Sequence, residues 1–296
     1  MQSTSIGPNF IVLGAAKSGT TALYRWLQQH PAVYMPTNKQ PHYFAHLQPS
    51  FRGPGDQALN RDIVTDRDAY LALFAPGADR SARGEASPFY LFYAQRVAEN
   101  IRATIPNCRL IVLLREPVAR AYSGYLHLVR DGRERGSFAQ ALANEEERLQ
   151  SGWEPLWGHR ALGLYGQQLA EILRVFPREQ VGVWLYEEMR HPEALFAEVC
   201  RFLDIDDRFV PVFSHHNTGG APRHPNLHAL LVRLRVPHLA KRLLPESWAQ
   251  WVVARYLDRR PAPADLAAEL RAFFEPDTAR LLELFPNKDF SSWVAN

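Results

Sequence analysis

One stretch near the start of the chain constrains its fold more than any other. In "FIVLGAAKSGTTALYRWLQQHP", residues 10–31, four apolar residues run directly into Gly14. An apolar pattern with the period of a helix resumes between Ala22 and Leu27. The segment therefore predicts a buried strand, a tight loop and a helix.

The loop in this stretch has the composition of an anion cradle. Small residues let backbone N–H groups approach a phosphate, the start of a helix favours negative charge, and hydroxyl side chains add donors. A Walker-type loop carries its lysine after the second glycine, whereas Lys17 here precedes Gly19. We predict a phosphate-binding loop of unusual order, with the candidate residues Ala16, Lys17, Ser18, Gly19, Thr20 and Thr21.

Apolar, strand-like runs alternate with helical patterns along the chain. The runs lie at 9–14, 109–116 and 180–188, and the helical patterns at 21–29, 93–106, 117–132, 162–177 and 191–205. Near-continuous apolar runs are typical of parallel strands that are covered on both faces. The pattern predicts an α/β fold, a P-loop-like and doubly wound parallel sheet flanked by helices on both faces, with ligands at the carboxyl ends of its strands.

The length and composition favour one domain over residues 1–296. The chain has 296 residues, of which 46% are hydrophobic, enough for one large core. Residues 46–68, rich in Gly, Pro and charge, predict a surface insertion, 222–262 a helical C-terminal cap, and 259–270 a linker before a last helix.

Charge, hydropathy and cysteine usage limit the class of partner. A net charge of +3 gives no reason to expect a nucleic-acid partner. No apolar run approaches the ~20 residues of a membrane span, and the N-terminus has no signal sequence, so we expect a cytoplasmic protein. Cys108 and Cys200 lack metal-ligand spacing, which predicts buried, reduced thiols. The oligomeric state is left open.

A second anion-binding pattern follows the run at 109–116. Arg115 ends the predicted strand, Pro117 suits the first turn of a helix, and Ser123 falls in its second turn. Arg115 and Ser123 can then face one anion. A magnesium-dependent NTPase is expected to carry an aspartate where Arg115 stands, so we predict no metal. Two anion sites predict a nucleotide with phosphates at two separate positions.

Together these segments resemble the paired signature of the sulfotransferases that use 3′-phosphoadenylyl sulfate (PAPS). "KQPHYFA" at 39–45, "GEASPFYL" at 84–91 and "FPREQVGVWLYEEM" at 176–189 resemble further elements of that family. The similarity is greatest to a bacterial branch related to the heparan sulfate sulfotransferase domains. It implies sulfuryl transfer to a hydroxyl or amine, with 3′,5′-adenosine bisphosphate (PAP) as the product. The first loop would hold the 5′-phosphosulfate and the second the 3′-phosphate.

The resemblance also implies roles for two basic residues. Lys17 is the cation that would follow the bridging oxygen as negative charge develops on it. Arg223, in "GGAPRHP", matches a late basic loop that closes over the nucleotide in relatives.

The chain departs from the family where the catalytic base is expected. The resembled enzymes have a glutamate at the position of Gln40, and a neutral amide can orient an acceptor but cannot take its proton. Three explanations stay open. His42 is the base, with an ordinary pKa of about 6.5; Glu85 is the base, unless it pairs with Lys39 or Lys17; or Gln40 marks an inactive variant, natural or engineered.

The acceptor site is predicted from aromatic and hydroxyl residues. The candidates are Tyr43, Phe44, Ser87, Tyr90, Trp153, Trp157 and His159. Such side chains suit a glycan, a lipid or another small-molecule acceptor equally well. Ala86 stands where heparan-type relatives carry a lysine, so one active-site cation is missing and a heparan-like acceptor is less secure.

Two other functions compete with sulfuryl transfer. A catalytically silent nucleotide-binding homologue would explain Gln40. A nucleotide-dependent kinase is opposed by the displaced Lys17 and by Arg115 at the strand end, and a magnesium requirement would favour it.

Overall fold

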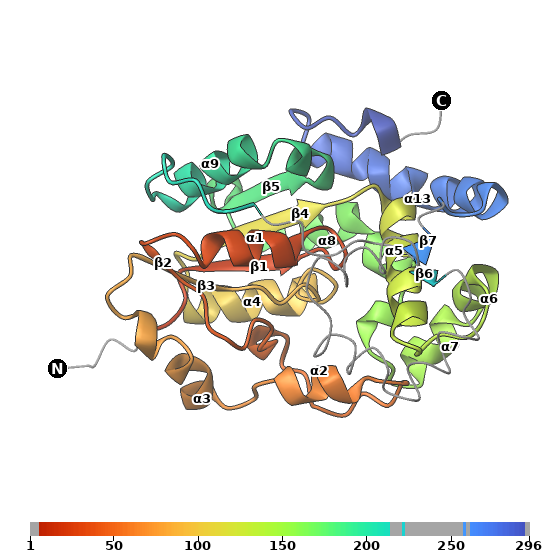
Figure 1. Cartoon of the computed structure of the whole chain (residues 1–296), viewed down its shortest axis with the longest axis horizontal. Helices are drawn as coiled ribbons and strands as arrows, with labels where there is room; N and C mark the ends of the chain where they lie inside the picture. Colours follow the sequence, from red (N-terminus) through yellow and green to blue (C-terminus); the bar gives the residue numbers. More distant parts are fainter. Residues whose placement is uncertain (1–5, 214–220, 223–256, 259–260, 294–296) are drawn as a thin grey trace.

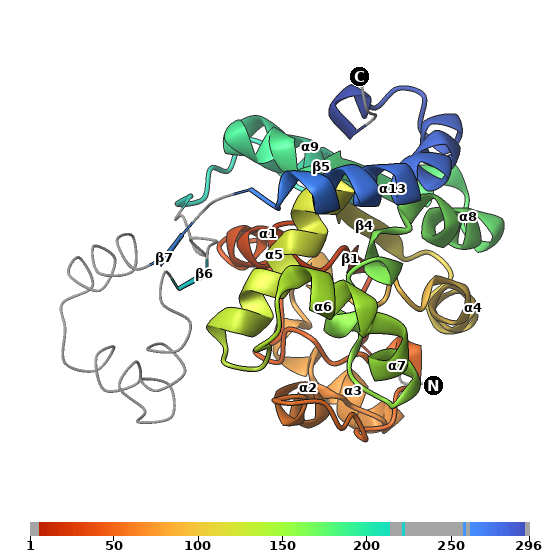
Figure 2. The same ribbon diagram turned by 90° about the vertical axis from the view of Figure 1, so that its right-hand side faces the viewer.

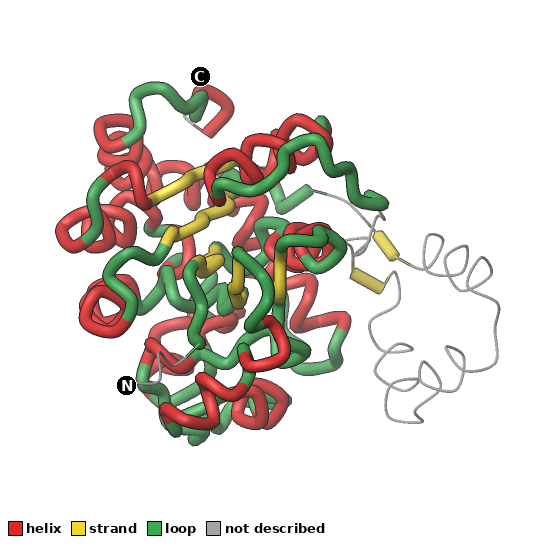
Figure 3. Tube along the Cα trace, turned by 90° about the vertical axis from the view of Figure 1, so that its left-hand side faces the viewer, coloured by secondary structure: helices red, strands yellow, loops and turns green. Residues whose placement is uncertain are grey.

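The fold is built around a five-stranded parallel sheet. A computed structural model of the chain describes residues 6–213, 221–222, 257–258 and 261–293. The strands, in spatial order, are β2 (Val33–Tyr34), β3 (Ala82–Glu85), β1 (Phe10–Gly14), β4 (Arg109–Leu114) and β5 (Val181–Leu185). Figure 3 shows these strands enclosed by helices. Because β1 lies between β3 and β4, the loops that follow these three strands gather at one edge of the sheet.

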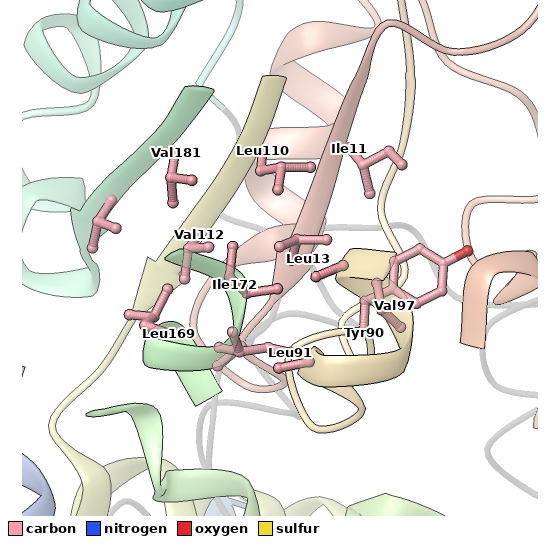
Figure 4. Close-up of a cluster of buried hydrophobic side chains, with 14 of the residues drawn as sticks. Ile11, Leu13, Tyr90, Leu91, Val97, Leu110, Val112, Leu169, Ile172 and Val181 are labelled. Atoms are coloured by element: carbon pink, nitrogen blue, oxygen red, sulfur yellow. The ribbon is translucent and has the colours of Figure 1, made fainter. Parts of the chain in front are cut away.

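Helices cover both faces of the sheet. Phe10 and Val12 point to one face and Ile11 and Leu13 to the other, since side chains alternate along a strand. The first face packs on α1 (Thr20–Leu27) and α9 (Pro192–Leu203), and the second on α4 (Ala94–Thr104) and α8 (Tyr165–Val175). Figure 4 shows the second of these cores, where side chains of the strands meet those of α4 and α8. The prediction of a parallel α/β sheet is confirmed.

The remaining elements surround this framework (Figure 1). They are α2 (Gln57–Asp62), α3 (Arg67–Ala72), α5 (Pro117–Arg130), α6 (Phe138–Ala143), α7 (Glu145–Gln150), α13 (Ala264–Leu284) and the antiparallel pair β6 (Ala221–Pro222) and β7 (Leu257–Asp258). The predicted linker at 259–270 is wrong in part, because α13 begins at Ala264. Most of the predicted cap at 222–262 lies outside the described residues.

Two smaller predictions concern the insertion and the thiols. The 46–68 segment contains α2, and it also buries Leu59 and the carboxylate of Asp56. Part of it is therefore packed into the molecule. Cys108 and Cys200 are both free and buried, as the sequence predicted.

Candidate active site

The loop between β1 and α1 depends on two glycines. Gly14 has a φ of 152° and Gly19, the residue before α1, a φ of 93°. A side chain on Gly14 would meet the Pro88 carbonyl oxygen at 2.8 Å, so only glycine lets the 84–91 segment approach this closely. The loop is also tied to the sheet, because the Ala15 amide donates to the Leu113 carbonyl at 2.7 Å.

The start of α1 offers donors to an anion. The first-turn amides of a helix have no intrahelical partners, and the helix dipole favours negative charge there. Ser18 is fully buried, and its hydroxyl makes no hydrogen bond of normal geometry among the described residues, although it lies close enough to the Tyr165 hydroxyl to affect its pKa. A phosphate oxygen would give this buried hydroxyl the partner that it lacks.

Lys17 is held in an unfavourable state. Its backbone is left-handed, with a φ of 70°, which costs free energy for a residue with a side chain. Burial, and next the charge of Arg130, lower the pKa of its ammonium from 10.5 to about 8, while Asp131 acts in the opposite direction. A strained backbone and a depressed pKa at one residue are typical of a functional site.

Arg115 connects the two predicted anion sites. Its Nη1 donates to the Lys17 carbonyl at 3.3 Å, and its guanidinium lies 4.6 Å from the centroid of the Tyr186 ring. The next residue, Glu116, caps α5 by accepting two backbone N–H groups. Ser123 lies half-buried in the second turn of that helix. Arg115 therefore contacts the loop between β1 and α1, residues 15–19, which is called the donor loop below. α5 begins at Pro117, as the sequence predicted.

Lys39 is a site residue that the sequence prediction missed. Its Nζ donates to Thr21 Oγ1 at 2.9 Å. Burial is the main cause that lowers its pKa to about 8, and Glu85 opposes the shift. The loop thus has a second half-buried cation beside it. The only sequence signal was that Lys39 directly precedes Gln40 in a family element.

Glu85 is enclosed among hydroxyl groups. Its carboxylate accepts hydrogen bonds from Ser87 Oγ at 2.6 Å and from the Tyr70 hydroxyl at 3.4 Å. Burial raises its pKa to about 7, against the hydrogen bonds of Ser87, Tyr90 and Tyr70. Glu85 and Ser87 are both completely buried. An acceptor bound at the surface therefore cannot touch this carboxylate.

His42 is sealed in the same way. Its ring stacks on Phe89 with centroids 5.5 Å apart, and its side chain is fully buried. Neither ring nitrogen has a hydrogen-bond partner among the described residues. Burial, and then Lys39, lower its pKa to about 3. His42 therefore lacks both the ordinary pKa and the exposure that were expected of a base. Gln40, two residues earlier, is half-buried.

Most of the predicted acceptor residues are closed off from solvent. Five of the seven are buried: Phe44, Ser87, Tyr90, Trp157 and His159. Only Tyr43 and Trp153 are partly exposed. The prediction of direct contact with an acceptor therefore needs correction for the five buried residues, since their rings and hydroxyls face the interior.

A buried charge cluster holds Trp157, one of these five residues. Asp56 is fully buried and accepts hydrogen bonds from the amides of Gly53 and Glu154, both at 2.8 Å, and from Trp157 Nε1 at 3.2 Å. Arg133 pairs with the carboxylates of Asp56 and Glu154. This cluster fastens the loop at 151–160 to the segment at 46–68, and burial raises the pKa of Glu154 to about 7.

A second group of charges lies at the end of α5. His127 Nε2 is 3.5 Å from Asp131 Oδ2, and Arg130 Nη2 is 2.5 Å from His127 Nδ1. Burial, then Lys17, then Arg130 and Arg133 lower the pKa of His127 to about 2. The imidazole is therefore within electrostatic range of Lys17. The spacing of Ser123, His127 and Asp131, four residues apart on one helix face, was the missed sequence signal.

Two features are absent from the described part of the chain. Within residues 6–213 and 261–293 there is no cluster of three or more His, Cys, Asp or Glu side chains that could hold a metal ion. No helix in the described part of the chain has both the length and the apolar character of a membrane span. Arg223 and its loop lie outside the described residues.

Comparison with known proteins agrees with this geometry. Residues 8–208 match the sulfotransferase family, and the chain belongs to that family. A solved sulfotransferase from Alicyclobacillus acidocaldarius is 39% identical, covers 97% of this chain and 98% of its own, and superposes with a TM-score of 0.77. The family resemblance inferred from the two anion-binding segments is confirmed.

Curated relatives cover part of the chain. The membrane-associated sulfotransferase kil1 of Dictyostelium discoideum is 26% identical over 278 residues, which is 67% of this chain and 56% of that protein. Heparan sulfate glucosamine 3-O-sulfotransferase 6 of Mus musculus is 31% identical over 173 residues, 57% of this chain and 44% of that protein. The chain spans about half the length of these curated relatives.

Proposed function

We propose that this protein transfers a sulfuryl group from PAPS to a hydroxyl or amine of an acceptor, and releases PAP. The observation that carries the proposal is Lys17, a half-buried cation with a strained backbone just before α1, linked by Arg115 to the start of α5. Ser18, Gly19, Thr20 and Thr21 would hold the 5′-phosphate of the nucleotide, and Arg115 and Ser123 its 3′-phosphate.

Two lysines, Lys17 and Lys39, would supply positive charge to the reaction. As the acceptor atom attacks sulfur, the bond between sulfur and the bridging oxygen breaks, and negative charge develops on that oxygen. A cation already in place stabilises this charge without reorganisation. Lys17 is placed to do so from the loop. Lys39, held by Thr21, supplies the second cation that Ala86 does not provide.

We expect the acceptor to bind against two aromatic side chains that are partly exposed. Tyr43 and Trp153 remain partly exposed where the other five candidates are buried. Aromatic faces of this kind bind sugar rings and apolar alcohols. The acceptor is accordingly a glycan, a lipid or a small phenol or alcohol. We also propose a cytoplasmic location, which the two free, buried cysteines support.

Calorimetry tests the donor assignment. PAP, AMP, and ATP with magnesium are titrated into the wild-type protein, into Arg115→Ala and into Arg109→Ala. Arg109 is the matched control, because it is an arginine at the opposite end of β4. We expect PAP to bind best, and Arg115→Ala to weaken PAP about 10- to 100-fold while AMP changes little, since a charge-assisted bond contributes about 1.5–3 kcal/mol.

The same titrations can overturn the proposal. Tighter binding of ATP with magnesium would favour a kinase. Equal affinities for PAP and AMP in the wild-type protein would remove the 3′-phosphate site.

A further inference from the structure

We propose that His127 is the general base that takes the acceptor's proton, and that Asp131 positions it, in place of the carboxylate missing at position 40. This inference rests on the sulfuryl transfer proposed above. It follows from the arrangement at the end of α5, which neither the family signature nor the sequence pattern assigned.

The face of α5 that carries Ser123 also carries His127. α5 begins beside Arg115, which contacts the donor loop, and Figure 2 shows the helix between α13 and α6. Ser123 and His127 are four residues apart and therefore share one face of the helix. The charge of Lys17 acts directly on His127. The face that meets the nucleotide at Ser123 thus continues to an imidazole near the sulfuryl group.

The contacts of His127 define which nitrogen is basic. Nε2 faces Asp131 Oδ2 at 3.5 Å, a pairing that favours the tautomer with its proton on Nε2. Nδ1 then carries the lone pair. Arg130 Nη2 lies 2.5 Å from Nδ1, and a guanidinium can donate only to an unprotonated nitrogen. Arg130 therefore occupies this lone pair in the free protein, and an acceptor hydroxyl would have to take the place of that N–H group.

The solvent exposure of its side chain distinguishes His127 from the other candidate bases, His42 and Glu85. The side chain of His127 is 27% exposed, whereas His42 and Glu85 are 0% exposed. A base must come within hydrogen-bond reach of the proton that it removes. Among these three groups, only His127 can meet a bound acceptor without rearrangement of the core.

The surrounding charges suit a base that works only when the donor is bound. Burial is the main cause that lowers the pKa of His127, and the charges of Lys17, Arg130 and Arg133 lower it further. Asp131 is the acidic side chain beside it, with Oδ2 3.5 Å from Nε2. The phosphosulfate of PAPS would bring negative charge to Lys17. That charge offsets the cations and makes the imidazole more basic. Without a donor the imidazole stays neutral.

In the proposed step, one bond to sulfur forms as another breaks. The acceptor oxygen or nitrogen forms a bond to sulfur, and the bond from sulfur to the bridging oxygen breaks with its electron pair on the phosphate of PAP. The proton of the acceptor moves to Nδ1 of His127. Asp131 stabilises the imidazolium, which later releases the proton to water.

Single-turnover transfer from radiolabelled PAPS tests this role. The acceptors are water and 4-nitrophenol, and the proteins are wild type, His127→Gln, His127→Ala and Asp131→Asn. His191→Gln is the control, because His191 is exposed and lies before α9. We expect His127→Gln to slow transfer about 10²- to 10⁴-fold, the usual contribution of a general base, with PAP affinity changed less than about threefold. Added imidazole should partly restore His127→Ala.

A nitrogen NMR spectrum gives an independent measurement that needs no turnover. The ring signal absent from His127→Gln should report an Nε2–H tautomer in the wild-type protein and lose that preference in Asp131→Asn. Wild-type transfer rates in His127→Gln, or an Nδ1–H tautomer in the wild-type protein, would overturn the assignment. Failure of PAP to bind the wild-type protein would instead contradict the proposed function.

Discussion

The donor loop and the buried cluster around Asp56 differ in how completely their charges are paired. At the donor loop, Lys17 and Lys39 are half-buried cations whose pKa values both fall to about 8. In the cluster, the carboxylate of Asp56 accepts from Arg133 and from three N–H groups. Cations with lowered pKa values indicate where an anion binds, and the fully paired cluster indicates a structural role.

Replacing Lys17 should have the largest effect on this contrast. Lys17→Met is expected to reduce transfer by about 10³-fold, the scale of losing one preorganised transition-state charge. It should also raise the free energy of unfolding at pH 7 by roughly 1–3 kcal/mol, because a buried ammonium with a lowered pKa destabilises the fold. Single-turnover assays and urea denaturation measure the two effects.

The pH dependence gives this prediction its control. The destabilising charge is fully present below the folded pKa of about 8 and disappears as the pH rises toward the unfolded value. The gain in stability of Lys17→Met over the wild-type protein should therefore shrink between these two values. Lys39→Met, the matched buried lysine, should gain stability similarly but lose less transfer. A destabilised Lys17→Met would show that the ammonium is structural.

Asp56→Asn should destabilise the cluster around Asp56 without changing the donor loop. The amide cannot accept all the hydrogen bonds that reach the two carboxylate oxygens, and it leaves Arg133 with one carboxylate fewer. We expect a loss of about 3 kcal/mol in unfolding free energy, with PAP affinity unchanged. Asp68→Asn, on the exposed face of α3, should change stability by less than about 0.5 kcal/mol. A parallel loss of PAP affinity would mean that the two regions are coupled.

The pH dependence of PAP binding should be the smallest of these effects. Because Lys17 and Lys39 lose their charge near pH 8 in the free protein, PAP should bind about tenfold more weakly at pH 9 than at pH 7 for each lysine that must be charged. Calorimetry at the two pH values measures this difference. The dependence should decrease in Lys17→Met, and a flat profile in the wild-type protein would argue against the contribution of either ammonium.

The sequence was sufficient to predict those strands whose signal lies within one contiguous segment. β1, β4 and β5 are buried on both faces and therefore read as continuous apolar runs. β3 was missed because its sequence, "ARGE", is not apolar. Its Gly84 makes room for the Phe10 ring, which a side chain there would meet at 2.3 Å. That requirement is visible only once the strands are adjacent.

The same limit applies to the site. The loop around Lys17 was predictable because its strand, glycines and helix are contiguous. The buried state of Trp157 was not, because it depends on Asp56, 101 residues away in the sequence. The hydrogen bond from Lys39 to Thr21 also joins different elements, and single-sequence patterns carry no information about such contacts.

The central position of β1 has a consequence for motion. The strand is paired on both sides, and the amides of Ala15 and Leu91 tie its end to neighbouring segments. Segments held this way open only when the whole sheet opens, so the backbone amides of Val12 and Leu113 should exchange with solvent on the timescale of global unfolding. The donor loop is thereby a rigid receptor, and entry and exit of the nucleotide are left to the surrounding segments.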